Sequence, residues 1–270
     1  MKQKKYQLLH FYYRNFKKKP KGVAMFHFGR CGSTVVSELL NQHPSIKWDN
    51  ELFQIIKMGK PKLFDVNYEK DMFKVLVNRY SRTREEFYGF ETKAIKEAHL
   101  GSSYLNLEFQ TYLDELIDLG FNKFIILKRR NYLKQVFSIA RGIENKQFHF
   151  KNKENLKGKK INFDPQKVVY GNMQEDILKV FNRIEERYEL LEKTLKEKGV
   201  EYLEIYYEDH IEEDPNLAYQ LICDYIDALP HNKVEIKQKK ISGHSILDEM
   251  IEPELVMNHL RNTQYEWMLK

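Results

Sequence analysis

Three short apolar runs, each followed by a stretch with helical spacing, constrain the fold of this chain more than any other feature. Residues 23–28 (VAMFHF) and 124–127 (FIIL) are expected to form buried strands, and residues 200–210 (VEYLEIYYEDH) a third. Helices are expected at 34–41, 71–80, 104–119, 131–142, 172–198 and 215–229. Because ten or more residues separate successive strands, the pattern predicts an α/β fold, a P-loop-like parallel sheet flanked by helices.

Neither an internal repeat nor a linker divides the chain, so we expect a single domain over residues 23–270. Residues 1–22 form a basic arm that could pack on the domain as a helix or contact a membrane surface. One helical face of this arm carries Tyr6, Leu9, Tyr13 and Phe16. Between about 142 and 170 the periodicity disappears and seven lysines occur, which predicts a lid-like excursion.

Composition narrows the class of partner. The net charge of +6 and the pI near 8.9 favour an anionic partner, but the basic residues are dispersed and form no nucleic-acid reader motif. Two cysteines, Cys31 and Cys223, are too few for a disulfide framework and indicate a reducing compartment. We find no secretory signal and no apolar run near the roughly 20 residues that span a bilayer, so a cytoplasmic protein is expected.

The segment FHFGRCGST, residues 26–34, follows the first expected strand and has the composition of an anion-binding turn. Gly29 and Gly32 allow backbone amides to turn inward, and the helix that opens near Ser33 adds unpaired N–H groups. Arg30 adds a charged guanidinium. A Walker A loop would carry lysine where Ser33 stands, so this is not a standard nucleotide-triphosphate loop. A purely structural turn is the alternative.

A second arginine–serine pair follows the second strand. In KRRNYLKQVFSIAR, Arg130 stands at the strand end and Ser138 lies eight residues later, a little over two helical turns. Ligands of parallel sheets bind at the carboxyl ends of the strands, so the two side chains could converge on one phosphate. The alternative is an ion-paired Arg130 and a solvent-facing Ser138.

These segments together resemble the sulfotransferases that use 3′-phosphoadenosine 5′-phosphosulfate (PAPS) and release 3′-phosphoadenosine 5′-phosphate (PAP). The motifs are most similar to the bacterial trehalose-sulfotransferase and carbohydrate sulfotransferase types, through LLNQHPSI (39–46), WDNELF (48–53) and IYYEDHIEEDP (205–215). The resemblance implies that the 3′-phosphate is bound by Arg130 and Ser138, and the 5′-phosphosulfate by Arg30, Cys31, Gly32, Ser33 and Thr34. Cys31 replaces a commoner serine, and Tyr132 a common proline.

The resemblance also implies in-line sulfuryl transfer, with Arg30 stabilising the departing phosphate. Glu51 is the expected base, although it could instead be a helix N-terminal carboxylate. His99 is the reserve catalytic candidate, and a lone histidine is more often structural. Lys93 could touch the sulfuryl group. No metal is expected, because a sulfuryl group carries less charge than a terminal phosphoryl group and a cationic side chain can neutralise it.

The expected acceptor is a hydroxyl of a carbohydrate, glycolipid or similar molecule. A late basic segment could fold over the nucleotide or lie solvated on the surface; it contains Lys239, Lys240, Ser242 and Gly243. Two other functions stay open. A P-loop kinase with a degenerate loop would bind ATP and Mg²⁺, and a nucleotide- or polyanion-binding module would lack a base.

Overall fold

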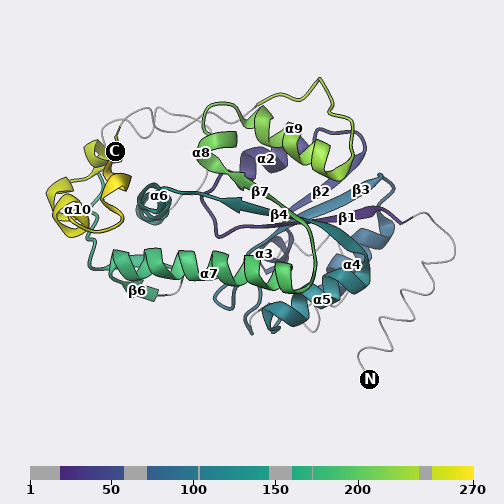
Figure 1. Ribbon diagram of the computed structural model, residues 1–270, viewed down its shortest axis with the longest axis horizontal. Coiled ribbons are helices and arrows are strands. Elements are labelled where there is room, and N and C mark those ends of the chain that lie inside the picture. Colours follow the sequence, from purple (N-terminus) through teal and green to yellow (C-terminus); the bar gives the residue numbers. More distant parts are fainter. Residues whose placement is uncertain (1–18, 58–71, 103, 146–159, 172, 237–244) are drawn as a thin grey trace.

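The centre of the molecule is a five-stranded sheet with the order β2-β3-β1-β4-β7, seen in the computed structural model (Figure 1). The structure describes residues 19–57, 72–102, 104–145, 160–171, 173–236 and 245–270. The strands are β1 (Lys21–Phe26), β2 (Ile46–Glu51), β3 (Phe87–Thr92), β4 (Phe121–Lys128) and β7 (Tyr202–Tyr206). Neighbouring strands in this sheet run parallel, which confirms the predicted α/β class.

Helices cover both faces of the sheet (Figure 1). One face carries α2 (Ser33–Leu40), α8 (Tyr207–His210) and α9 (Pro215–Ile226), and the other carries α3 (Leu52–Lys57), α4 (Phe73–Arg82), α5 (Phe109–Leu119) and α7 (Ile177–Glu197). Helix α6 (Tyr132–Glu144) follows β4 and lies beside the C-terminal elements η4 (Ile246–Glu249), α10 (Pro253–Leu260) and η5 (Glu266–Leu269). A hairpin of β5 (Val168–Tyr170) and β6 (Met173–Glu175) completes the described elements.

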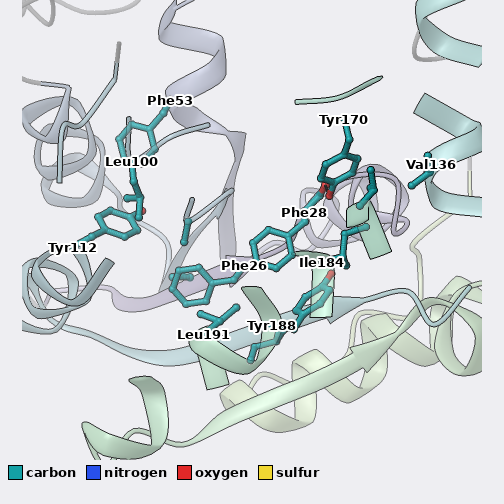
Figure 2. Packing of buried hydrophobic residues seen from close by; sticks show 14 of the residues in the cluster. Phe26, Phe28, Phe53, Leu100, Tyr112, Val136, Tyr170, Ile184, Tyr188 and Leu191 are labelled. Carbon is teal, nitrogen blue, oxygen red and sulfur yellow. Dashed lines mark hydrogen bonds between the residues drawn. The ribbon is translucent and has the colours of Figure 1, made fainter. Parts of the chain in front are cut away.

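The core is divided by the sheet into two apolar clusters, because successive side chains of β1 point to opposite faces. On the larger side, the ring of Phe26 stacks on that of Phe124, with centroids 6.0 Å apart. The ring of Phe28 lies 4.5 Å from that of Tyr188, and Tyr170 donates a hydrogen bond to the Phe28 carbonyl (Figure 2). The residue just before Gly29 is therefore held in the core.

Several expected boundaries differ from the observed ones. Strands β2 and β3 were not expected from the sequence. Helix α6 continues through Gly142 to Glu144, since a single glycine costs a helix only about 1 kcal/mol. The helix expected from 104 begins instead at Phe109, because Asn106 adopts a left-handed backbone with φ 53°. The third expected strand ends at Tyr206, where α8 begins.

Part of the expected excursion at 142–170 belongs to the core. Its buried side chains in the larger cluster are Ile161, Phe163, Val168 and Tyr170. Residues 146–159 lie outside the described residues, as do the arm face of Tyr6 to Phe16 and the basic segment at 239–243, so their roles stay predictions. In the part of the chain that the structure describes, no helix has the length and apolar character needed to cross a membrane.

Candidate functional site

The loop after β1 lies where the chain direction across the sheet changes. From β1 the chain passes through α2 to β2 on one side, whereas from β4 it continues toward β7 on the other. Ligands of open parallel sheets bind at such switch points, outside the carboxyl ends of the strands. Because β1 and β4 are neighbours, the loops that follow them, residues 27–32 and 129–131, lie side by side.

The loop backbone is left-handed at three of four successive residues, with φ of 88° at Gly29, 55° at Arg30 and 86° at Gly32. Side chains from the loops around it hold this conformation. The Gly29 carbonyl accepts a hydrogen bond from Gln135 Nε2 at 2.7 Å, and the Arg30 carbonyl accepts one from Arg129 Nη1 at 3.0 Å. Non-glycine residues in left-handed backbone are strained, so such a turn persists only where its surroundings fix it.

Helix α2 begins directly after this turn and has Gly32 as its N-cap. Gly32 provides no capping side chain, so the first-turn amides and the positive end of the helix dipole suit an anion. The hydroxyls of Ser33, which is buried, and Thr34, which is half-buried, belong to the same turn. The thiol of Cys31 is fully buried in the smaller apolar cluster, so Cys31 can offer an anion only its backbone amide.

Three guanidinium groups gather behind the loop. Arg30 Nε donates to Ser138 Oγ at 2.9 Å, which brings together two of the expected site residues. Burial and the charges of Arg141 and Arg129 lower the pKa of Arg30, so the three cations lie close enough to repel one another. The sequence places Arg129 with Arg130 at the strand end but gives it no role, and Arg141 was not expected. Arg141 stands three residues after Ser138, on the same face of α6, and that spacing was an available signal.

Arg130 and Ser138 have different partners in the structure. Arg130 is exposed and forms a bidentate ion pair with Asp209, with Nη2 2.6 Å from Oδ2. Its guanidinium carbon lies 4.2 Å from the ring centre of Tyr206. Glu208, the neighbour of Asp209, accepts the backbone N–H groups of Arg130 and Asn131, both at 3.0 Å. The acidic residues of α8 thus occupy the positive start of α6.

Glu51 reaches the site through an irregularity in β2. In the pairing with β3, Asp49 is opposite Phe90 and Glu51 is opposite Glu91, so Asn50 is an extra residue. Such a bulge changes the face of the sheet on which the next side chain lies. One oxygen each of Glu51 and Glu91 and one ring nitrogen of His27 consequently lie within 4.8 Å of one another.

Glu51 is the last residue of β2 and is ion-paired with Lys93, whose Nζ lies 2.7 Å from Glu51 Oε2. Burial raises the pKa of Glu51, but the charge and the hydrogen bond of Lys93 outweigh it, and the pKa is lowered to about 2. Glu51 is therefore a carboxylate at neutral pH. It can accept a proton, although with little basicity.

His99 lies next to Glu51, with Nε2 3.7 Å from Oε2. Its Nδ1 accepts the backbone N–H of Lys93 at 3.0 Å, so the ring proton is on Nε2, and this nitrogen makes no hydrogen bond among the described residues. Burial lowers the pKa of His99 to about 3, which keeps the ring neutral. Because its acceptor nitrogen is already used, His99 is poorly arranged to act as a base.

The His27, Glu51 and Glu91 group has the composition of a metal site, but its hydrogen bonds disfavour one. Nδ1 of His27 accepts the Gly29 N–H at 3.1 Å, which leaves the ring proton on Nε2, 3.1 Å from Glu91 Oε2. A protonated nitrogen cannot ligate a metal. The Lys93 ammonium on Glu51 adds a competing positive charge.

No protein-family model matches the chain, and no curated protein matches it. Among solved structures, the chain is similar to a protein described as a sulfotransferase from Alicyclobacillus acidocaldarius. The sequences are 13% identical, the TM-score is 0.49, and the match covers 94% of this chain and 96% of that one. A likeness of this size identifies neither a substrate nor a reaction, so the functional proposal rests on the residues of the site.

Proposed function

We propose that this chain is a sulfotransferase that moves a sulfuryl group from PAPS to a hydroxyl acceptor. One observation carries the proposal: the ion pair of Glu51 and Lys93 lies close to the loop after β1, which contains Arg30. A Cβ added to Gly29 would lie 3.6 Å from Lys93 Cε, and Lys93 is ion-paired with Glu51. A proton acceptor thus lies beside a turn suited to bind the anionic leaving group.

The turn after β1 fits the 5′-phosphosulfate end of PAPS, which supplies the sulfuryl group. Arg30 and the amides from Arg30 to Thr34 would bind and stabilise the departing phosphate. The Ser33 and Thr34 hydroxyls add neutral donors. As the bond between acceptor oxygen and sulfur forms, the bond between sulfur and the phosphate oxygen breaks, PAP leaves, and Glu51 takes the hydroxyl proton.

Glu51 is our proposed base despite its low pKa. In a loose transition state the bond to the leaving group is largely broken before the new bond forms, so the acceptor hydroxyl loses its proton late. A weak base that is fully ionised can accept that proton at the stage when the attacking oxygen has become acidic. Neutral His99, whose Nε2 lies 3.7 Å from Glu51 Oε2, would add no competing charge beside this carboxylate.

The 3′-phosphate of PAPS is assigned to Arg130 and Ser138, in agreement with the resemblance. Arg130 would then exchange the Asp209 carboxylate for the phosphate, which has greater charge. Ser138 accepts from Arg30 and retains its own O–H for donation. Arg141, one turn later on α6, is ion-paired with Glu249 at 2.7 Å and still lies close enough to lower the pKa of Arg30.

A kinase reading would require a Mg²⁺ site beside the loop. The only group of three possible ligands found among the described residues is that of His27, Glu51 and Glu91, whose ring proton and Lys93 neighbour oppose a cation. Sulfuryl transfer with cationic side chains requires no such ion. The acceptor class, a carbohydrate or glycolipid hydroxyl, rests on the resemblance of the motifs, as does membrane contact through the N-terminal arm.

Isothermal titration calorimetry with PAP and with ATP, each with and without Mg²⁺, tests the donor. We expect PAP to bind more tightly than ATP, with no requirement for Mg²⁺. Tighter binding of ATP that depends on Mg²⁺ would favour a kinase and refute the proposal.

Transfer of labelled sulfate from PAPS to a panel of sugar and glycolipid hydroxyls then tests the reaction. Replacing the base, Glu51→Gln, should lower kcat by at least about a hundredfold while PAP binding is kept. Asp114→Asn is the control, because Asp114 also pairs with a lysine, Lys198, at 2.6 Å, but on the exposed surface of α5. Binding of PAP without transfer to any acceptor would indicate the non-catalytic module.

A further inference from the structure

A buried histidine holds the first amide of the anion-binding turn. His27 follows β1 directly and is fully buried. Its Nδ1 accepts the N–H of Gly29, the first left-handed residue of the turn, at 3.1 Å. This N–H is therefore directed into the protein, and the amides that can point outward begin at Arg30.

The other side of the His27 ring meets a buried carboxylate. Nε2 lies 3.1 Å from Oε2 of Glu91, which is near the end of β3 and is 2% exposed. Glu91 Oε1 accepts a hydrogen bond from Ser37 in α2, and Ser37 Oγ accepts one from Trp48 Nε1 at 3.0 Å. A continuous chain of polar contacts thus runs from β2 through α2 and β3 to the turn.

The neutral ring is the form that this geometry requires. Burial favours this neutral form, whereas the Cys31 and Glu91 side chains act against it and raise the pKa of His27 to about 10, so these two neighbours and the Gly29 hydrogen bond oppose each other. A second proton would sit on Nδ1 and end the hydrogen bond from Gly29, because that bond uses the Nδ1 lone pair. The protonation state of the ring therefore determines whether the hydrogen bond between Gly29 and His27 forms.

Two further anchors complete the support of the turn. Gln135 holds the Gly29 carbonyl and Arg129 holds the Arg30 carbonyl. Arg129 is charged and would also attract the donor directly, whereas His27 is fully buried and contacts the loop backbone, the Cys31 side chain and Glu91. A substitution of His27 therefore alters the shape of the turn while the arginines around it are kept.

We propose that His27, which lies with Nε2 3.1 Å from Glu91, is a positioning residue that fixes the turn in its donor-binding shape. This inference rests on the proposed function for its consequence, tighter donor binding, but the hydrogen bond itself is a property of the protein alone. Fixed amides bind an anion more tightly than mobile ones, since the ordering cost is already met in the folded chain.

Two substitutions of His27 distinguish the effect of losing the hydrogen-bond acceptor from the effect of losing the imidazole ring. The amide oxygen in His27→Asn can occupy the place of Nδ1 and accept the Gly29 N–H, whereas His27→Gln extends past it and leaves the buried N–H without an acceptor. We expect His27→Gln to bind PAP roughly tenfold more weakly than the wild type. His27→Asn should recover most of this loss.

His43 offers a matched control. It is also buried, its Nδ1 accepts the N–H two residues later (Ser45) at 3.1 Å, and its Nε2 lies 2.8 Å from the Leu229 carbonyl. His43→Gln should lower the melting temperature as His27→Gln does, yet leave PAP affinity unchanged. Equal loss of affinity in both variants, or wild-type affinity in a folded His27→Gln, would overturn the proposal.

Nitrogen-15 NMR of the wild-type protein tests the hydrogen bond between Gly29 and His27 without any bound nucleotide. The shifts of His27 at neutral pH should be those of a neutral ring with its proton on Nε2, and the Gly29 amide should exchange slowly. An imidazolium signal, or fast exchange of Gly29, overturns the inference even if variants fail to fold. If the wild type does not bind PAP, the proposed donor is wrong, while these two signals still report on the positioning contact.

Discussion

Arg30 Nε donates a hydrogen bond to Ser138 Oγ, 2.9 Å away, and so joins the turn after β1 to helix α6. The two residues are 108 positions apart in the chain. The contact orients the guanidinium that leads the turn and places a hydroxyl beside it. An arginine so held can meet an anion without first losing side-chain freedom.

Removing the hydroxyl tests this contact. Ser138→Ala leaves Arg30 Nε without its acceptor, so we expect PAP affinity to fall by about tenfold and the free energy of unfolding by about 1 kcal/mol. Calorimetry and urea unfolding measure the two effects. Ser81→Ala is the control, since Ser81 Oγ donates to the Val77 carbonyl within α4 and the substitution should change stability alone. Unchanged PAP affinity in Ser138→Ala would contradict the assignment.

Asp209 is expected to compete with the donor for Arg130. Asp209→Asn removes the carboxylate that pairs with Arg130, so PAP should bind several-fold more tightly, while ATP, which lacks a 3′-phosphate, should bind as before. Titrations of both nucleotides measure the difference. Asp114→Asn breaks a similar exposed pair, with Lys198 at 2.6 Å, and should change neither affinity. A parallel gain for ATP would show that Arg130 does not select the 3′-phosphate.

The fold class could be predicted because β1 and β4 are buried on both faces and read as continuous apolar runs. The strands β2 and β3 could not, because polar residues and a glycine interrupt them. Asp49 in β2 is buried only because Arg79 and Tyr88 bond its carboxylate, each at 2.8 Å. Gly89 in β3 leaves room for Trp48, whose Cζ3 would lie 2.1 Å from an added Cβ. Such partners are distant in sequence.

The turn at 29–34 was visible in the sequence because its glycines, arginine and hydroxyl residues are consecutive. The support around it was not. Arg129 and Arg130 are the same residue type and cannot be told apart in the sequence. The position at which β4 ends determines that Arg129 binds the turn and that Arg130 pairs with Asp209. The position of Glu51 depends on a bulge of one residue at Asn50, and no sequence pattern around Asn50 predicts this bulge.

Because the pKa of Glu51 is low, we expect kcat to be independent of pH on the acid side of neutrality. Because the pKa is lowered from 4.5 to about 2, Glu51 stays ionised and its pairing contributes stability above about pH 4.5, which is lost as the pH falls toward 2. Wild-type kcat should therefore not fall between pH 7 and 5 on account of this group. In Lys93→Met the burial of Glu51 is no longer offset, its pKa rises, and kcat should fall with decreasing pH in that range.

The control for this profile is Lys198→Met, which breaks the exposed pair with Asp114. It should keep the wild-type pH dependence. An acid limb near neutral pH in the wild type, or its absence in Lys93→Met, would show that Glu51 is not the group whose ionisation limits the rate.

Gly32 should tolerate no side chain, and Gly199 provides the comparison. Both have left-handed backbone, with φ of 86° and 64°, so alanine at either position costs about 1 kcal/mol of strain. An added Cβ at Gly32 would lie 2.9 Å from Ile211 Cγ2, whereas one at Gly199 has nothing within 4 Å. Urea unfolding should therefore show a loss of about 1 kcal/mol for Gly199→Ala and about 2–3 kcal/mol for Gly32→Ala. PAP binding should be lost only in Gly32→Ala, because that glycine caps α2 inside the turn; wild-type affinity in this variant would mean that the turn does not hold the donor.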